Sequence, residues 1–277
     1  MFLFENRKQN PKTFTVFSRA LNAECEIEHQ MLRPFLRGAN IRRYSIGEPE
    51  YWILYPYKLV GERTAWYSEN EIASEFPNTW RYLKAVKQEM SDRGSERMNY
   101  PIWYGLWNAR DMRLLGAPKI LTPTIAARPS FSYDQDGASY FLGSGAGGPG
   151  AYGIIMKDGA FDPLYVLGLM NSRIVGLFMQ ATSSVFSGGY WAYSQQFLWD
   201  IPFRPVDLKK KDDREMYEHM VSMVRNMLVL QKGRLAAKTP TDQARIDRDI
   251  TALDRQIDAL VYRLYGLTNQ EIAMIEG

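Results

Sequence analysis

A glycine-rich run at residues 143–153 contains the spacing G-x-G-x-x-G, which occurs in loops that hold dinucleotides or S-adenosylmethionine. In such loops a strand leads into the glycines, and a helix whose N-terminal amides face the phosphates follows them. The residues SYFL at 139–142 favour a strand, but AYGIIM at 151–156 favours a second strand over a helix. The sequence therefore predicts a connection between two strands and no cofactor site here.

The histidines and the cysteine do not form a recognisable metal or nucleophile site. His29 and His219 are far apart in the sequence, and Cys25 and His29 have no second ligand pair to complete a tetrahedral set. Glu24 and Glu26 flank Cys25, and their charge disfavours the thiolate that nucleophilic catalysis requires. We expect no metal and no catalytic residue among these groups.

Two other kinds of catalytic site are poorly supported. Asp200, Asp207 and Lys209 have a spacing similar to that of metal-dependent nucleases, but nearby prolines argue against the central strand that would hold them. The chain also lacks the Asn-Pro-Pro-Tyr or Asp-Pro-Pro-Tyr box that would hold a flipped base. The chain is therefore expected to be non-catalytic by itself.

Basic residues are interleaved with aromatic and hydroxyl-bearing residues over much of the chain. The net charge is +3 and the isoelectric point is about 8.8, which permits a polyanionic partner without requiring one. Cations can neutralise phosphates, and hydroxyl or amide groups can read base edges. The residues expected to hold phosphates are Arg42, Arg43, Lys119 and Arg128. The residues expected near base edges are Ser187, Tyr190, Tyr193 and Gln195.

The elements that would position these residues indicate an α+β fold with a mixed sheet. Short apolar runs between Gly, Pro and Asn predict strands at 51–57, 119–123, 139–142 and 152–156. Apolar residues at helical spacing predict helical stretches at 76–93 and 163–182. Residues 1–29 show no sustained period and are expected to be a lead-in to a body at residues 30–205.

Residues 206–277 predict a C-terminal helical hairpin. A charged cluster precedes a helix whose apolar face includes Met220 and Met227, and Thr241 or Asp242 is a candidate cap for the second helix. Gly266 marks the end of that helix. With 45% hydrophobic residues, a single cysteine and no apolar run long enough to span a bilayer, a cytoplasmic location without membrane contact is the expectation.

The order of these segments resembles the TaqI-like C-terminal specificity domain, the target recognition domain of adenine-N6 DNA methyltransferases and type IIG restriction-modification enzymes. The matching segments are LRPFLRGANIRRY at 32–44, YWILYPY at 51–57, WRYLK at 80–84, PKILTPTIAARPSFSYD at 118–134, AYGII at 151–155, YVLGLMNSRIVGLFM at 165–179 and SSVFSGGYWAYSQQFLWDIPF at 183–203. The segment IDALVYRLYGLTNQEI at 257–272 extends the resemblance nearly to the last residue.

This resemblance implies a sequence-specific DNA-binding domain of a restriction-modification or phage-defence system. It implies double-stranded DNA and a methyltransferase domain or subunit as partners, with S-adenosylmethionine bound only in that methyltransferase part. Two alternatives remain open at this point. One is a nuclease or methyltransferase subunit with an unrecognised site, and the other is a protein-interaction subunit that does not bind DNA.

Overall fold

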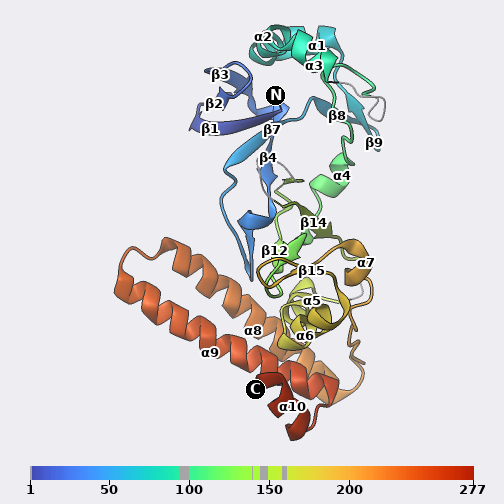
Figure 1. The fold of residues 1–277 in the computed structure, drawn as a ribbon, viewed down its shortest axis with the longest axis vertical. Helices are drawn as coiled ribbons and strands as arrows, with labels where there is room; N and C mark the ends of the chain where they lie inside the picture. Colours follow the sequence, from blue (N-terminus) through green and yellow to red (C-terminus); the bar gives the residue numbers. More distant parts are fainter. Residues whose placement is uncertain (1, 94–99, 139, 144–148, 158–160) are drawn as a thin grey trace. The chain divides into compact units, whose positions relative to one another are not determined.

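The computed structural model describes residues 2–93, 100–138, 140–143, 149–157 and 161–277 (Figure 1). The chain divides into two compact units, each assembled from three segments of the sequence. Unit 1 comprises Met1–Leu36, Glu48–Pro118 and Gln135–Ala146. Unit 2 comprises Arg37–Gly47, Lys119–Asp134 and Gly147–Gly277. Because the chain passes repeatedly between the units, they do not follow the expected boundaries at residues 30 and 206.

Unit 1 is built on a six-stranded sheet with the order β13-β4-β7-β1-β2-β3. Its strands are β1 (Leu3–Gln9), β2 (Thr13–Ser18), β3 (Ala23–Glu28), β4 (Leu32–Leu36), β7 (Tyr51–Leu54) and β13 (Phe141–Leu142). All pairs are antiparallel except the parallel pair of β13 with β4. Residues 2–29, expected to be a lead-in, contain three of these strands, which bury Phe4, Phe14 and Val16.

Short helices pack on this sheet where the sequence predicts a single helical stretch at 76–93. They are α1 (Glu69–Glu75), α2 (Pro77–Ala85) and α3 (Lys87–Asp92). The Glu28 carboxylate, which is buried at the end of β3, accepts hydrogen bonds from the backbone and side chains of Asn78 and Thr79. A carboxylate at a helix N-terminus satisfies amides that have no partner within the helix, so Glu28 fixes the start of α2 on the sheet.

Smaller elements complete unit 1. They are the hairpin of β8 (Tyr57–Val60) with β9 (Arg63–Trp66) and the helix α4 (Met112–Leu115). The strand predicted at 51–57 is interrupted at Tyr55 and Pro56, between β7 and β8. The hydroxyl of the buried Tyr55 donates to the carbonyl of Ala109 over 2.7 Å, which ties this break to the segment before α4.

Unit 2 contains two three-stranded sheets and a short hairpin. The first sheet has the order β12-β10-β14, from β10 (Lys119–Pro123), β12 (Ser132–Asp134) and β14 (Ala151–Ile154). The second has the order β11-β16-β15, from β11 (Ile125–Ala126), β15 (Val185–Phe186) and β16 (Tyr190–Ala192). The hairpin consists of β5 (Ile41–Arg42) and β6 (Ser45–Ile46). The strand predicted at 119–123 is confirmed as β10, and a strand rather than a helix follows Pro149, while residues 144–148 lie outside the described residues.

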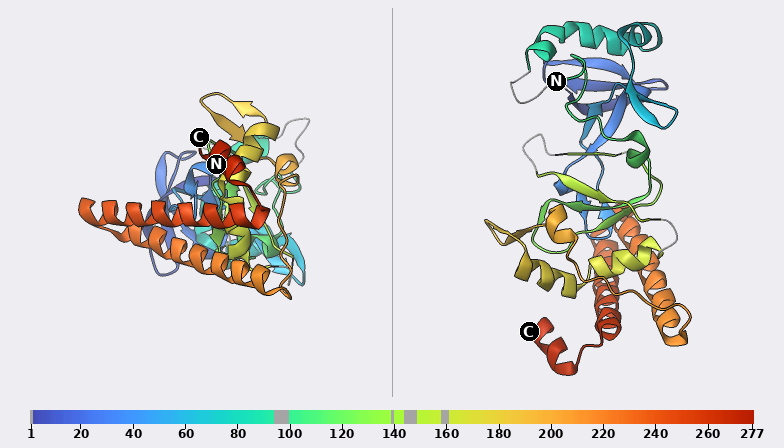
Figure 2. Two further views of the ribbon diagram at one scale, coloured as in Figure 1. Left: turned by 90° about the horizontal axis from the view of Figure 1, so that it is seen from below. Right: turned by 90° about the vertical axis from the view of Figure 1, so that its right-hand side faces the viewer.

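The helices of unit 2 are α5 (Pro163–Met170), α6 (Arg173–Thr182), α7 (Gln195–Leu198), α8 (Lys211–Ala236), α9 (Pro240–Tyr265) and α10 (Asn269–Glu276). The stretch predicted at 163–182 is two helices, separated at Asn171 and Ser172 and bent by 58°. The pair of α8 and α9 confirms the predicted C-terminal hairpin, and Figure 2 shows the two helices side by side. Thr239, and not Thr241 or Asp242, caps α9, and Gly266 ends it with a left-handed φ of 67°.

The core of unit 2 forms where α5 packs against α8. Every residue from Leu164 to Met170 is buried. A Cβ atom at Gly168 would lie 2.5 Å from the sulfur of Met220, so the absence of a side chain there permits the close approach of α8. Together, the sheets and the packed helices confirm the predicted α+β class.

The helices α5 and α6 have an apolar composition. Among the described residues, no single helix is long and apolar enough to cross a membrane, although the bent pair of α5 and α6 meets the length and composition required. The side chains of α5 that give this pair its apolar character are buried in the core of unit 2.

A buried ion pair between β10 and β12 gives the first prediction. Lys119 Nζ lies 2.9 Å from Asp134 Oδ2, and the two side chains are 3% and 4% exposed. Lys119→Met removes the cation beside a buried carboxylate and should lower the free energy of unfolding by about 3 kcal/mol. The double variant Lys119→Met/Asp134→Leu should recover most of this loss in urea unfolding. A single variant as stable as the wild type would contradict the structural role of the pair.

Candidate nucleic-acid interface

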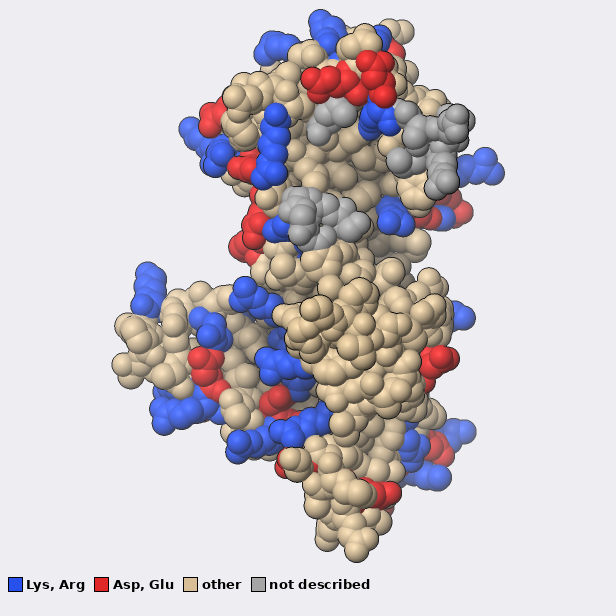
Figure 3. All heavy atoms as spheres, in the orientation of Figure 1, with Lys and Arg blue, Asp and Glu red and all other residues tan. Residues whose placement is uncertain are grey.

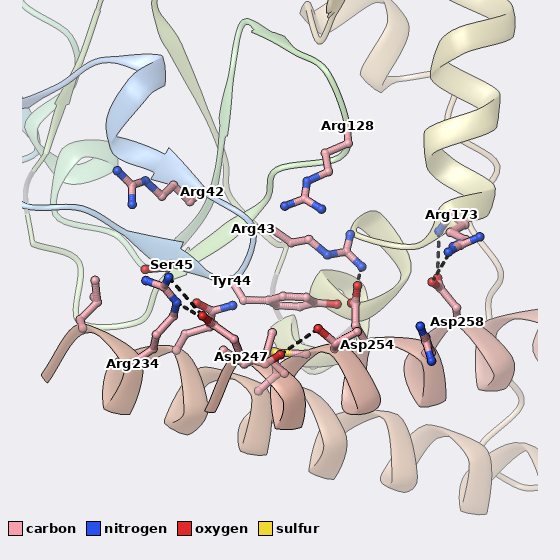
Figure 4. Close-up of a pocket in the computed structure, with 16 residues that line it drawn as sticks. Arg42, Arg43, Tyr44, Ser45, Arg128, Arg173, Arg234, Asp247, Asp254 and Asp258 are labelled. Carbon is pink, nitrogen blue, oxygen red and sulfur yellow. Dashed lines mark hydrogen bonds and ion pairs between the residues drawn. The ribbon is translucent and has the colours of Figure 1, made fainter. Parts of the chain in front are cut away.

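An arginine-rich pocket of about 550 Å³ lies in unit 2, between the β5–β6 hairpin, the loop after β11, and helices α8 and α9 (Figure 4). We call it the arginine pocket. The charged residues that line it are Arg42, Arg43, Arg128, Arg173, Arg234, Arg255, Asp247, Asp254 and Asp258. Six arginines and three aspartates leave an excess of three positive charges, which favours an anionic ligand.

Three of the arginines are paired with the three aspartates. Arg43 pairs with Asp254 and Arg234 with Asp247, and Arg173 Nε lies 3.6 Å from Asp258 Oδ2. The remaining three, Arg42, Arg128 and Arg255, are exposed and have no ion pair within the part of the chain that the structure describes. These three guanidinium groups carry the charge that an external anion would meet.

Arg43 connects the β5–β6 hairpin to the helices. Its guanidinium donates hydrogen bonds to the backbone carbonyl of Asn171 and to the carboxylate of Asp254, and its side chain is only 12% exposed. It also lies over the ring of Tyr44, 5.2 Å from the centroid. Tyr44 has a left-handed φ of 60°, and its N–H donates to the carbonyl of Phe131 over 2.8 Å. These contacts fix the backbone that carries the neighbouring Arg42.

A buried asparagine fixes the loop that carries Arg128. Asn171 is fully buried; its Oδ1 accepts from the N–H of Phe131 and its Nδ2 donates to the carbonyl of Phe131, both at 2.9 Å. Phe131 follows Arg128 by three residues and is itself fully buried. Asn171 therefore holds the Arg128 loop directly and the Arg42 hairpin through Arg43.

The structure places three of the four predicted phosphate contacts together. Arg42, Arg43 and Arg128 all line the arginine pocket, although Arg43 is committed to Asn171 and Asp254. Lys119 is buried in its ion pair with Asp134, so its ammonium group is out of reach of an external phosphate. Burial of this lysine could not be read from its own position, because it depends on an acid on the neighbouring strand.

The four predicted base contacts separate into exposed and buried residues. Ser187 and Tyr190 are exposed on the hairpin of β15 and β16, and Gln195 is exposed at the start of α7. Tyr193 is 1% exposed, and its ring packs edge-on against Phe131 at 5.9 Å. Tyr193 is thus a core residue that supports the Arg128 loop and is not accessible to a base.

Sequence reasoning missed Asn171, which holds the segments around the pocket, and the lining residues Arg173, Asp254, Arg255 and Asp258. One available signal was the polar pair Asn171–Ser172 inside an otherwise apolar helical stretch. Another was the spacing of Asp254 and Asp258, which are four residues apart and therefore share one face of α9.

Cys25 and the groups that could bind a metal are the other candidates for chemistry. Burial raises the pKa of the Cys25 thiol to about 11, so desolvation, and not the flanking glutamates, is what disfavours the thiolate. No group of three or more His, Cys, Asp or Glu side chains suited to a metal ion occurs within the described ranges.

Asp258 gives a prediction about pH. Its burial raises the pKa of the carboxyl to about 6, although the N–H of Arg173 and the charge of Arg43 oppose this shift. An aspartate with a folded-state pKa above its unfolded value stabilises the fold while protonated, and this contribution is lost as the pH rises through about 6. Asp258→Asn keeps an oxygen for the Arg173 N–H and does not ionise. Relative to the wild type, its free energy of unfolding should therefore rise by up to about 3 kcal/mol between about pH 4 and pH 7.

Urea unfolding across this pH range measures the effect. Asp249→Asn changes a half-exposed aspartate on the same helix and is the matched control, with little expected change. A difference between Asp258→Asn and the wild type that does not vary with pH would contradict the raised pKa.

Comparison with known proteins finds one relative and one family. The chain is 22% identical over 268 residues to the type II restriction enzyme and methyltransferase RM.Eco57I of Escherichia coli. This match covers 91% of the chain but 26% of RM.Eco57I, so the chain spans about a quarter of the length of that relative. Residues 33–203, which include the β5–β6 hairpin, the Arg128 loop and the hairpin of β15 and β16, match the model of one family. The chain belongs to the family of the TaqI-like C-terminal specificity domain.

Proposed function

We propose that this chain recognises specific sequences in double-stranded DNA as the target recognition domain of a restriction-modification or phage-defence system, and that it has no catalytic activity of its own. The observation that carries the proposal is the arginine pocket of a specificity domain, in which Arg42, Arg128 and Arg255 have no internal ion pair among the described residues. Arginines held on a rigid frame suit phosphate groups, because little side-chain and backbone freedom is lost on binding.

Different residues would contact the phosphates and the bases. Arg42, Arg128 and Arg255 hold the DNA backbone, which supplies affinity without sequence preference. Ser187, Tyr190 and Gln195 are exposed hydroxyl and amide groups that can bond to base edges, and so they supply the preference for a sequence. We do not include Lys119 and Tyr193 among the proposed DNA contacts, because both are buried.

The partners follow from the family. We assign methyl transfer, and with it the binding of S-adenosylmethionine, to a methyltransferase domain or subunit that works with this chain in the cytoplasm. RM.Eco57I is named as both a restriction enzyme and a methyltransferase, and it is about four times as long as the part that this chain matches.

The phosphate role predicts a change in salt dependence. The logarithm of the DNA-binding constant should fall linearly with the logarithm of the salt concentration, and Arg128→Ala or Arg255→Ala should each reduce the slope by about one. Fluorescence anisotropy with a labelled duplex measures the slope. Arg263→Ala, an exposed arginine on α9 outside the arginine pocket, is the matched control and should leave the slope unchanged.

Binding that does not depend on salt, or no binding, would contradict the proposal and favour a protein-interaction subunit. Cleavage of DNA by the purified chain with a divalent metal ion, or its binding of S-adenosylmethionine, would favour the enzyme alternative.

The base-reading role predicts a change in sequence preference. Gln195→Ala removes an exposed amide and should weaken binding to preferred duplexes selected from a randomised pool by about 1 to 3 kcal/mol, with little effect on the rest of the pool. Gln196→Ala, the exposed neighbour, is the matched control. Sequencing of bound and unbound duplexes measures the preference. An equal loss over the whole pool would remove Gln195 from base recognition.

A further inference from the structure

The hairpin of β15 and β16 exposes apolar side chains at its tip. Val185 is 70% exposed, Phe186 is 47% exposed and Tyr190 is 45% exposed. Phe186 and Tyr190 are cross-strand partners, so their side chains are neighbours on the hairpin. Exposed apolar groups gathered in this way are unfavourable in water and indicate a surface that becomes covered on binding.

The tip is narrow as well as apolar. The loop between the two strands consists of Ser187, Gly188 and Gly189, and both glycines have left-handed φ values of 79° and 75°. Residues with a side chain rarely adopt such values, and nothing lies within 4 Å of the position a Cβ would take at Gly189. The turn therefore adds only one small side chain beyond Phe186 and Tyr190.

The base of the hairpin is held firmly. Ala192 is buried and pairs with Ile125 of β11, and the N–H of Tyr193 donates to the carbonyl of Thr124 over 2.8 Å. The partly buried Trp191 packs against the core of unit 2. The strands thus hold the apolar tip in place from the sheet, so the tip needs little rearrangement before it can contact a partner.

The same sheet connects the tip to the arginine pocket. The strand β11 pairs with β16 and ends two residues before Arg128, while α6 begins at Arg173 in the pocket and leads into β15. Residues 174–199 contain no Lys, Arg, Asp or Glu. Figure 3 shows this contrast as blue side chains beside a broad tan surface of unit 2.

This combination fits one kind of partner. The arginine pocket attracts an anionic backbone, and the uncharged tip neither repels that backbone nor offers a cation to it. A duplex has both properties that are required, namely phosphates outside and an apolar stack of bases inside. We propose that the tip of the β15–β16 hairpin inserts Phe186 between neighbouring base pairs of the bound duplex, with its cross-strand partner Tyr190 beside it on the same face of the hairpin. This inference rests on the proposed DNA recognition.

Insertion exchanges one stacking contact for another. Separating two base pairs costs a few kcal/mol, and apolar wedges that separate them commonly kink the duplex by about 20–90°. Stacking of a nucleobase on the aromatic ring and burial of Phe186 offset this cost. Because the hairpin is already ordered where it joins the sheet, little conformational entropy is lost on binding. Steps between base pairs differ in how easily they separate, so the wedge also adds a preference for flexible steps.

The test uses the full chain and a duplex selected from the randomised pool, with 2-aminopurine placed at each adenine in turn. The fluorescence of this base rises when stacking is lost. The wild type should produce a severalfold rise at one step. Phe186→Ala should abolish the rise and weaken binding about tenfold, as expected for the loss of one aromatic stacking contact, without changing the salt slope. Phe186→Trp should retain the rise, which shows that the effect requires an aromatic ring.

Val229→Ala is the matched control, because Val229 is an apolar residue of unit 2 with 67% exposure that lies on α8. It should change neither fluorescence nor affinity. Salt-dependent binding by the wild type with no rise at any adenine, or an unchanged rise with Phe186→Ala, would overturn the wedge and leave DNA recognition standing. No salt-dependent binding would overturn both. A tip that instead binds a protein would give DNA affinity and fluorescence that are unaffected by Phe186→Ala.

Discussion

The hydrogen bonds of the buried Asn171 organise the segments that form the arginine pocket of unit 2. Asn171 ends α5, and its carbonyl at the negative end of this helix accepts from the Arg43 guanidinium. Two residues later α6 begins, and the Asp258 carboxylate accepts from the N–H of Arg173 at the positive end of that helix. The break between the helices thus receives a cation on one side and an anion on the other. Because the Asn171 amide also bonds both backbone groups of Phe131, a single junction fixes the Arg42 hairpin, the Arg128 loop and α9.

This arrangement divides the basic residues into two groups. Arg43 and Lys119 are satisfied by buried or partly buried carboxylates, and their loss would leave a negative charge in a poorly solvated place. Arg42, Arg128 and Arg255 lie at the surface without such a partner in the described part of the chain. Basic composition alone does not separate these groups, since the difference arises only when distant strands and helices bring acids to some arginines and not to others.

The same reasoning explains what could be predicted from the sequence. The strand β10 and the α8–α9 hairpin follow from short-range apolar patterns, and these patterns are clear at 119–123 and after residue 210. Within residues 2–29 the strand β3 is hard to recognise because it reads AECEIE, whose exposed glutamates hide the alternation, although its pairing with β2 is regular. The break at Asn171 was missed because α5 is buried on all sides, so its apolar residues show no face that ends there. For the candidate site, residue types predict Arg42 and Arg128, which both line the arginine pocket. The burial of Lys119 and Tyr193 depends on partners elsewhere in the sequence.

The positions of the charged and uncharged surfaces have a consequence for specificity. Arg128 follows the edge strand β11 of the β11-β16-β15 sheet by two residues, and the apolar hairpin supplies the other two strands. Backbone hydrogen bonds between the three strands hold the Arg128 loop and the hairpin together. Phosphate contacts set where the duplex lies, and the hairpin then meets the bases at a fixed distance along it. Val185, Phe186 and Tyr190 lie outside the core cluster of unit 2, so substitutions at these three positions should cost little stability. Because none of them carries a charge, such changes also leave the electrostatic part of the affinity intact. A module built in this way can acquire a new target sequence through its hairpin while its hold on the DNA backbone stays the same.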